Sequence, residues 1–138
     1  MASPESDKPS SVAAAIDVIE ATYELTLAYA AQGRKGEEDD PLGVRQALRR
    51  ADAALDVLAA ATPAELGSPG GAVGEATATM LAVLKHDAAN ARAAIRFVLA
   101  QRAIGSQIID NLNASIHIRA LLTDIFLLDE AFGKTDSA

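Results

Sequence analysis

One histidine stands in a pattern that could carry chemistry. His86 is followed directly by Asp87, and Asn90 comes four positions after the histidine. Imidazole gains and loses protons near neutral pH and can form covalent intermediates, and a carboxylate beside it can assist proton transfer. These residue types indicate proton or phosphoryl exchange at His86, provided that the side chain is open to a partner.

Helical spacing predicts that His86 is accessible. A helix is predicted over 75–103, with apolar side chains at intervals of three and four residues. They are Leu81, Leu84, Ala88, Ala91, Ile95 and Val98. At about 100° per residue, His86 points about 160° away from Leu84 and from Ala88. Asn90 lies one turn further along the same side. Three small residues surround the pair: Ala82, Ala89 and Ala93.

Three basic side chains run along the same helix beside His86: Lys85, Arg92 and Arg96. None of them has an acidic residue three or four positions away, which is the spacing at which ion pairs form within a helix. The chain as a whole is acidic, with a formal net charge of -7. We therefore expect this basic stripe to find its partner in another helix or in another molecule.

The string His86-Asp87-x-x-Asn90 resembles the H-box of the dimerisation and phosphotransfer domain of histidine kinases. The similarity runs from Glu75 to Phe132. Two aliphatic segments look like the continuation of the first helix of that domain and the end of its second: 94–99 and 121–128. In that family an exposed histidine on a helical hairpin accepts the phosphoryl group, and two hairpins pair into a dimeric four-helix core.

The resemblance implies that His86 is a phosphoacceptor, that Asp87 assists proton transfer and that Asn90 positions water for dephosphorylation. It implies a protein partner, either a receiver domain or a histidine kinase, and a possible homodimer. We expect the partner to bind around the histidine, at Lys85, Ala89, Arg92, Ala93, Arg96 and Phe97. Two features depart from the family. Ala91 stands where a proline commonly follows the asparagine, and the sequence contains no ATP-binding domain, so the phosphoryl group must come from a partner.

A second interpretation leaves the chemistry out. An exposed histidine is also compatible with a non-enzymatic helical adaptor or regulatory module, or with a relative that kept the hairpin and lost the activity. No metal or cofactor is expected, because di-metal bundles need Glu-x-x-His pairs and this chain has none. His117, between two isoleucines, is expected to be half-buried. Asp124 lies near a helix end, where the dipole disfavours acids.

Four helices are predicted, as two hairpins of one all-α four-helix bundle. They span 10–32, 41–61, 75–103 and 106–132. The first hairpin covers 10–62, a Gly/Pro linker 63–74 and the second hairpin 75–133; segments 1–9 and 134–138 are expected to be a disordered and a frayed tail. Asp40-Pro41 is expected to start the second helix, and Ser106 to cap the fourth. Whether the hairpins pack within one chain or across a dimer stays open.

Composition bounds the class of protein. The 138 residues contain no cysteine, which excludes disulfides and thiolate metal sites. Alanine supplies 31 positions, and alanine favours closely packed helices. The acidic charge disfavours nucleic acid and anionic lipid as partners. No apolar run reaches the roughly 18 residues that a membrane span needs, and the N-terminal segment lacks a signal-peptide pattern. We expect a cytoplasmic protein.

Overall fold

The chain folds into five α-helices in the computed structural model, which describes residues 8–36 and 43–132. The helices are α1 (Val12–Ala30), α2 (Val44–Ala59), α3 (Gly71–Leu99), α4 (Ser106–Ala114) and α5 (Ile116–Phe132). A short 3-10 helix, Ala64–Leu66, lies between α2 and α3. The expected all-α class is confirmed, because the described residues form helices and no strand.

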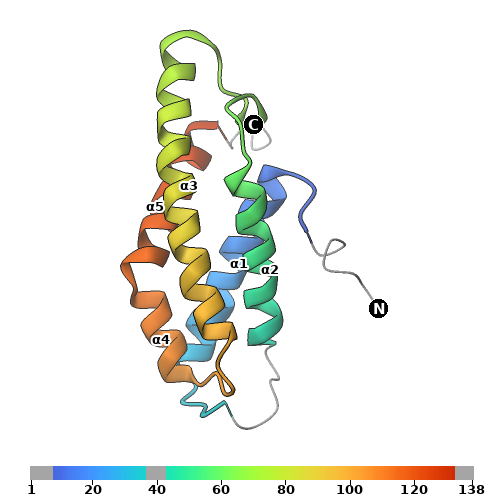
Figure 1. The fold of residues 1–138 in the computed structure, drawn as a ribbon, viewed down its shortest axis with the longest axis vertical. Coiled ribbons are helices and arrows are strands. Elements are labelled where there is room, and N and C mark those ends of the chain that lie inside the picture. The colour runs from blue at the N-terminus through green and yellow to red at the C-terminus, as the bar shows by residue number, and fades with distance from the viewer. Residues whose placement is uncertain (1–7, 37–42, 133–138) are drawn as a thin grey trace.

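The helices run along the long axis of the molecule, side by side (Figure 1). The main contacts of α2 are with α1 and α3, α3 packs on α5, and α4 packs on α1. α4 and α5 follow each other along one column of the bundle. The fold is therefore a bundle of four helical columns, one of which consists of two helices.

The helix expected over 106–132 is interrupted at Ser115. This residue has an extended backbone, with φ -65° and ψ 149°. Its side-chain oxygen accepts a hydrogen bond from the backbone N–H of Ile118 at 3.3 Å. Serine is a strong N-cap, because its hydroxyl replaces a missing backbone partner of the first turn. Ser115 thus begins α5 at a point where the apolar pattern alone predicted a continuous helix.

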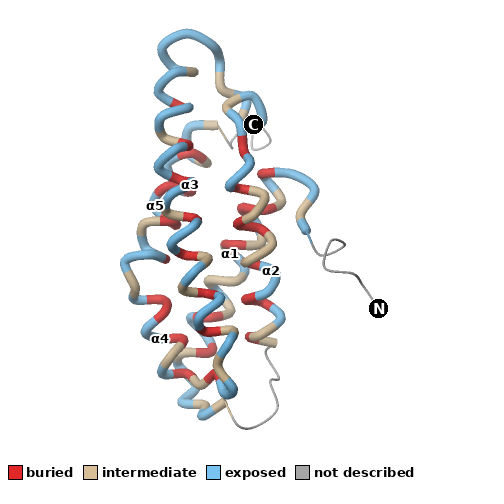
Figure 2. The backbone as a smooth tube through the Cα atoms, in the orientation of Figure 1, coloured by how far each residue is buried: buried red, intermediate tan, exposed pale blue. Residues whose placement is uncertain are grey.

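Each helix turns an apolar stripe toward a common core (Figure 2). All six apolar positions predicted for the third helix are buried in α3, which confirms that part of the sequence analysis. They belong to the same core cluster as the fully buried leucines of α2, which are Leu48, Leu55 and Leu58. Burial of this hydrocarbon is the main term that holds the bundle together, and it fixes which side of α3 faces outward.

Polar contacts join the end of α1 to the start of α4. The Tyr29 hydroxyl donates to the backbone oxygen of Ile104 at 2.5 Å, and the Ser106 hydroxyl donates to the backbone oxygen of Tyr29 at 2.6 Å. Ser106 Oγ also accepts from the backbone N–H of Arg34 at 2.8 Å. The sequence predicted Ser106 as the N-cap, but Gly105 holds that position. Ser106 instead links the two hairpins.

Helix boundaries differ from the expected ones by a few residues. α3 begins at Gly71 rather than at residue 75. The expected start of the second helix, Asp40-Pro41, lies outside the described residues. The turn after α2 is a capping box: the Glu65 carboxylate accepts from the Thr62 backbone N–H at 3.0 Å, and the Glu65 N–H donates to Thr62 Oγ1 at 3.4 Å.

The expected tails, 1–9 and 134–138, also lie outside the described residues, apart from residues 8 and 9. Gly133, where the second hairpin was expected to end, lies outside them too. Within the ranges that the structure does describe, no helix is both long enough and apolar enough to cross a membrane.

Candidate functional site

His86 lies on the outer surface of α3, as its helical spacing predicts. Both His86 and Asn90 are exposed, and they stand one turn apart on the same side of the helix. The three small residues around the pair, Ala82, Ala89 and Ala93, are exposed as well. The imidazole is therefore open to solvent, and its neighbours on α3 leave room for another molecule to approach.

Asp87, the next residue, points into the contact between α3 and α5. Its carboxyl group shares a hydrogen bond with that of Asp124 on α5. Asp124 is buried, at 5% exposure, and its Oδ2 atom has no hydrogen-bond partner among the described residues. Two carboxyl groups can share such a bond only when one of them holds a proton.

The pKa of Asp124 is raised from 3.8 to about 7. Burial is the main cause, because it takes water away from the charged form. The hydrogen bond with Asp87 and the negative charge of Asp87 raise the pKa further. The resemblance implies that Asp87 assists His86 in proton transfer, whereas in this structure the carboxyl group of Asp87 is engaged with Asp124.

The two arginines of the basic stripe find their partners in α2. Arg92 donates to Asp52 at 2.8 Å and to Asp56 at 3.2 Å. Arg96 donates to both carboxylate oxygens of Asp52, at 2.9 and 3.3 Å. Lys8 makes a further ion pair with Asp56. The sequence left open whether these cations pair with another helix or another molecule, and for both arginines the partner is α2.

These contacts lower the pKa of both aspartates. Burial acts first on Asp52 and raises its pKa, but the hydrogen bonds and charges of Arg92 and Arg96 outweigh burial and hold the pKa below its ordinary value. For Asp56 the hydrogen bond from Lys8 is the largest cause of the lowered pKa. Both carboxylates therefore stay charged at neutral pH and hold α3 against α2.

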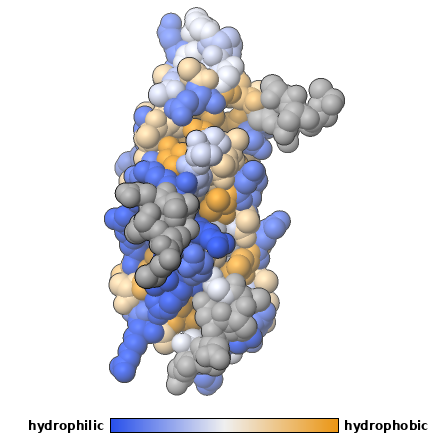
Figure 3. All heavy atoms as spheres, turned by 90° about the vertical axis from the view of Figure 1, so that its right-hand side faces the viewer, coloured by the Kyte–Doolittle hydropathy of each residue, from blue (hydrophilic) through white to orange (hydrophobic). Residues whose placement is uncertain are grey.

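A groove of about 320 Å³ lies between α2 and α3. Five of the predicted partner-binding residues line it: Lys85, Ala89, Arg92, Ala93 and Arg96. Leu55 and Ala59 line it from α2. The sixth predicted residue, Phe97, does not line this groove. Figure 3 views the molecule from the side of α1 and α2, where hydrophilic surface is interrupted by hydrophobic areas.

A stripe on α3 lies along its border with α5. Its members are spaced by four and three residues, which places them on one face: Val83, Asp87, Asn90, Ala94 and Phe97. The contact of Asp87 with Asp124 directs this face toward α5. A matching stripe on α5 runs through Ile116, Ala120, Asp124 and Leu127. We call the two stripes together the border face.

The border face carries large apolar side chains that are open to solvent. Their exposed fractions are 44% for Val83, 66% for Phe97, 73% for Ile116 and 59% for Leu127. His86 lies three residues after Val83 and so stands beside this face. Phe97 is among the residues that the sequence predicts to bind a partner. The other three were not predicted, because only the packing of α3 on α5 brings them to this border.

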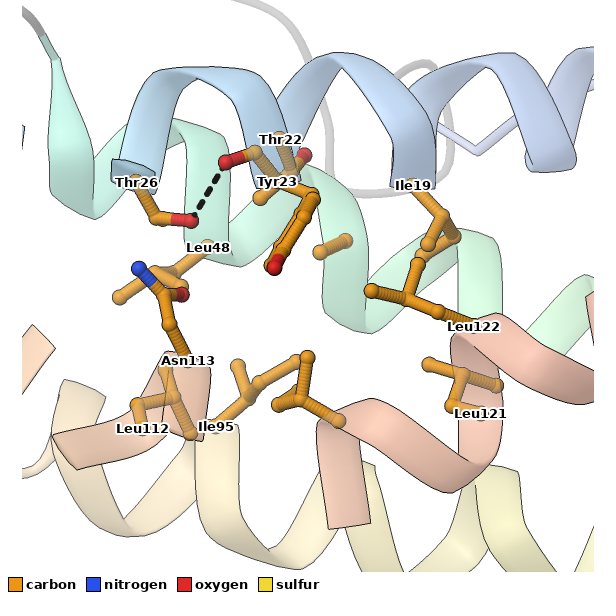
Figure 4. A pocket seen from close by; sticks show the side chains of 12 residues that line it. Ile19, Thr22, Tyr23, Thr26, Leu48, Ile95, Leu112, Asn113, Leu121 and Leu122 are labelled. Carbon is orange, nitrogen blue, oxygen red and sulfur yellow. Dashed lines mark hydrogen bonds between the residues drawn. The ribbon is translucent and has the colours of Figure 1, made fainter. Parts of the chain in front are cut away.

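A pocket lies between α1 and the junction of α4 with α5 (Figure 4). Most of its lining side chains are hydrocarbon, and the polar ones are Thr22, Tyr23, Thr26 and Asn113. Asn113 is only 9% exposed, and its Nδ2 atom has no hydrogen-bond partner in the described ranges. Sequence reasoning missed this pocket because its lining comes from all five helices. The local signal is the carboxamide of Asn113, which stands four residues after Ile109 and so on the apolar face of α4.

His117, expected to be half-buried, is exposed. The break at Ser115 places it in the first turn of α5, where Ile118 is buried and His117 is not. The residues that the structure describes hold no group of three or more histidine, aspartate or glutamate side chains placed to bind a metal. Comparisons with protein-family models, curated proteins and solved structures give no match for this chain.

Proposed function

We propose that the chain is a helical docking module that binds a protein partner through the border face. The observation that carries the proposal is the set of four large, exposed apolar side chains along one helix border: Val83, Phe97, Ile116 and Leu127. Soluble proteins rarely leave large contiguous apolar patches open to water unless the patch binds something. Aromatic side chains such as Phe97 are also enriched at protein interfaces.

The partner we propose is a protein of the two-component signalling type, either a receiver domain or a histidine kinase. Such a partner bound at the border face contacts His86 as well, because the imidazole is exposed one turn from Val83. The likeness of the His86-Asp87-x-x-Asn90 string to the H-box supports this choice.

Phosphotransfer at His86 is the second candidate function, and the exposure of His86 among small side chains favours it. In this reaction a lone pair of the neutral imidazole attacks the phosphorus of an aspartyl phosphate on a receiver domain. The bond from phosphorus to the carboxylate oxygen breaks as the bond from phosphorus to nitrogen forms. The other ring nitrogen then gives its proton to solvent, which leaves a neutral phosphoimidazole ring.

We rank docking above phosphotransfer because the charged side chains of α3 near His86 already have partners within the bundle. Arg92 and Arg96 are held by aspartates of α2, so their charge is already largely compensated. Asp87 shares its hydrogen bond with Asp124. The apolar side chains of the border face, by contrast, remain exposed, and their burial against a partner lowers the free energy of the complex.

Docking is tested with two variants of the border face and one matched control. Phe97→Ser and Leu127→Ser remove exposed hydrocarbon from the face. Phe126→Ser removes a phenylalanine that is 51% exposed but stands two residues after Asp124, on the opposite side of α5. Proteins retained by the wild type are quantified for each variant, and each candidate partner is then purified and titrated by calorimetry.

We expect one partner whose binding is weakened about thirtyfold by Phe97→Ser, the effect of losing an interface hot spot. The control Phe126→Ser should bind it as the wild type does. Equal losses in all three variants, or no loss in the two variants of the border face, reject this face as the docking surface.

Phosphotransfer is tested with the two exposed histidines. The wild type, His86→Gln and His117→Gln are each incubated with radiolabelled phospho-receivers and with histidine kinases, and acid-labile label on the chain is followed. Label on the wild type and on His117→Gln, but not on His86→Gln, establishes the reaction. Absence of label with a partner that still binds the border face leaves an adaptor without phosphotransfer. Circular dichroism checks that both variants keep the helical fold.

A further inference from the structure

We propose that the pocket between α1 and the α4–α5 junction binds a small neutral molecule, mostly hydrocarbon, that carries one hydrogen-bond acceptor. This inference is independent of the docking proposal, because it rests on different residues in the interior of the bundle.

The donor is the side-chain amide of Asn113. Its residue is nine-tenths buried and its Nδ2 atom makes no hydrogen bond within the described part of the chain. In Figure 4 the Asn113 amide points from α4 toward Thr26 of α1, across the pocket. Buried polar atoms in folded proteins nearly always have a partner, either protein or bound solvent or ligand. The unpaired N–H therefore marks the place where an acceptor belongs.

The two threonine hydroxyls at the pocket donate to backbone oxygens. Thr22 donates to the backbone oxygen of Val18 at 2.8 Å, and Thr26 donates to the backbone oxygen of Tyr23 at 3.0 Å, the dashed line in Figure 4. These hydroxyls are therefore not the donors that a carbonyl or ether oxygen in the pocket needs. The amide of Asn113 is the buried donor that remains to select the acceptor of the ligand, and the half-buried Tyr23 carries a further hydroxyl at the pocket.

The remaining wall sets the class of the ligand. No charged side chain lines the pocket, so neither a cation nor an anion finds a counterion there, and burying an unpaired charge is strongly unfavourable. Branched hydrocarbon from several helices, including Ile19, Ile95 and Leu121, forms most of the surface. Small-molecule sites generally combine such an apolar wall with a few placed polar groups.

The size of the pocket restricts the ligand further. The volume open to the centre of a water molecule is about 30 Å³. Pockets that hold drug-sized molecules are far larger, roughly 300 Å³ or more. Tyr23 is half-buried at this place, with its ring against the pocket (Figure 4). A ring that is open to solvent on one side can rotate aside when a small molecule enters between α1 and α5.

The break at Ser115 explains why a pocket exists at this position. α1 packs mainly on α2 and α4, whereas α5 packs mainly on α3. The column formed by α4 and α5 therefore packs on α1 up to the end of α4 and on α3 beyond it. Where α4 ends, α1 and α5 are not in close contact. Asn113 is the second-to-last residue of α4, which places its amide at this gap.

The test compares two ring compounds of nearly the same shape. Cyclopentanone has a carbonyl acceptor, and methylenecyclopentane has a carbon in place of the oxygen. Each compound is titrated into the isotope-labelled full chain, and amide and side-chain NH₂ signals are followed by nuclear magnetic resonance. The same titrations are made with Asn113→Leu, which removes the donor at similar volume, and with Ala51→Val, which fills the pocket from α2.

We expect saturable shifts of the Asn113 NH₂ signals with cyclopentanone and binding of methylenecyclopentane about fivefold weaker, the size of one net hydrogen bond. Asn113→Leu should bind both compounds alike, and Ala51→Val should bind neither while its spectrum keeps the dispersion of a folded bundle. The proposal is overturned if the wild type binds both compounds equally or neither saturably. It is equally overturned if a long-lived water stays on the Asn113 NH₂ group at the highest concentration of cyclopentanone.

Discussion

The carboxyl group of Asp124 is hydrogen-bonded to that of Asp87 across the border between α5 and α3, and burial together with this contact raises the pKa of Asp124 to about 7. This pair lies in the middle of the border face, one residue from His86 in sequence. The contact between the two helices that form the proposed docking surface is therefore sensitive to proton concentration in the physiological range.

We predict that the free energy of unfolding falls as pH rises toward the folded-state pKa of Asp124, about 7, and levels off above it. The folded-state pKa of Asp124, about 7, lies above its ordinary value of 3.8, so between these two values the native state binds more protons than the unfolded state and stability declines with rising pH. Asp124→Asn keeps a hydrogen bond to Asp87 without a titrating group. The variant should be more stable than the wild type at pH 8 by about 1 to 3 kcal/mol.

Urea unfolding of both proteins from pH 4.5 to pH 8.5 checks this prediction. The window stays above the range in which Asp52 and Asp56, whose pKa values are lowered, lose their charge. Parallel stability curves for the wild type and Asp124→Asn would show that the pair does not control the pH dependence.

The guanidinium of Arg45 donates hydrogen bonds to backbone carbonyls at the C-terminal end of α3. It donates from α2 to the backbone oxygens of Leu99 at 3.0 Å, Gln101 at 2.6 Å and Arg102 at 2.9 Å. These carbonyls lie at a helix end, where a cation is also favoured by the dipole. Arg45→Met should lower the free energy of unfolding by about 1 to 2 kcal/mol. The matched change Arg50→Met, at an exposed position of the same helix, should stay within about 0.5 kcal/mol of the wild type.

Two glycines after α1 should differ in their tolerance of alanine. Both have positive φ, 64° at Gly33 and 83° at Gly36, so both substitutions carry the cost of the left-handed conformation, about 1 kcal/mol. A Cβ atom at Gly33 meets nothing within 4 Å, whereas one at Gly36 comes within 2.6 Å of the backbone of Ile104. Gly36→Ala should therefore be less stable than Gly33→Ala by about 2 kcal/mol or more in urea unfolding. Equal stabilities of the two variants would contradict the close contact of Gly36 with the backbone of Ile104.

The two arginines on Asp52 should contribute unequally. The Arg92 side chain is 26% exposed and that of Arg96 is 59% exposed, and solvent screens the more exposed pair. Double-mutant cycles with Asp52→Asn should give a coupling of about 1 kcal/mol for Arg92→Met and less than about 0.5 kcal/mol for Arg96→Met. Raising the salt concentration should weaken the second coupling more. A larger coupling for Arg96 would contradict the order of burial.

The parts of the structure that were predicted depend on local spacing. The buried side of α3 follows from the recurrence of apolar residues, and the exposure of His86 follows from that side by geometry alone. The break at Ser115 was not predicted, because the apolar pattern continues from Leu112 to Ile118 across it. Serine is acceptable inside a helix as well as at its start, so its type does not decide between them.

The contacts between helices could not be predicted from the spacing of residues within one helix. The pairing of Arg92 with Asp52 spans 40 residues, and nothing in the periodicity of either helix says which neighbour each one has. The contact of Asp87 with Asp124 likewise depends on the register of α3 against α5. The exposed apolar side chains of the border face and the pocket beside Asn113 depend on the same packing, and the structure is needed to find them.

The hydrogen bonds of Ser106 and Tyr29 hold the two hairpins together at one end of the molecule only. At the other end, the first turns of α3 extend past the neighbouring helices and are largely exposed (Figure 2). The first turns of α3 therefore hold fewer buried residues than the turns that follow. Local opening starts in these first turns, so amide protection along α3 should rise from Gly71 toward the middle of the helix.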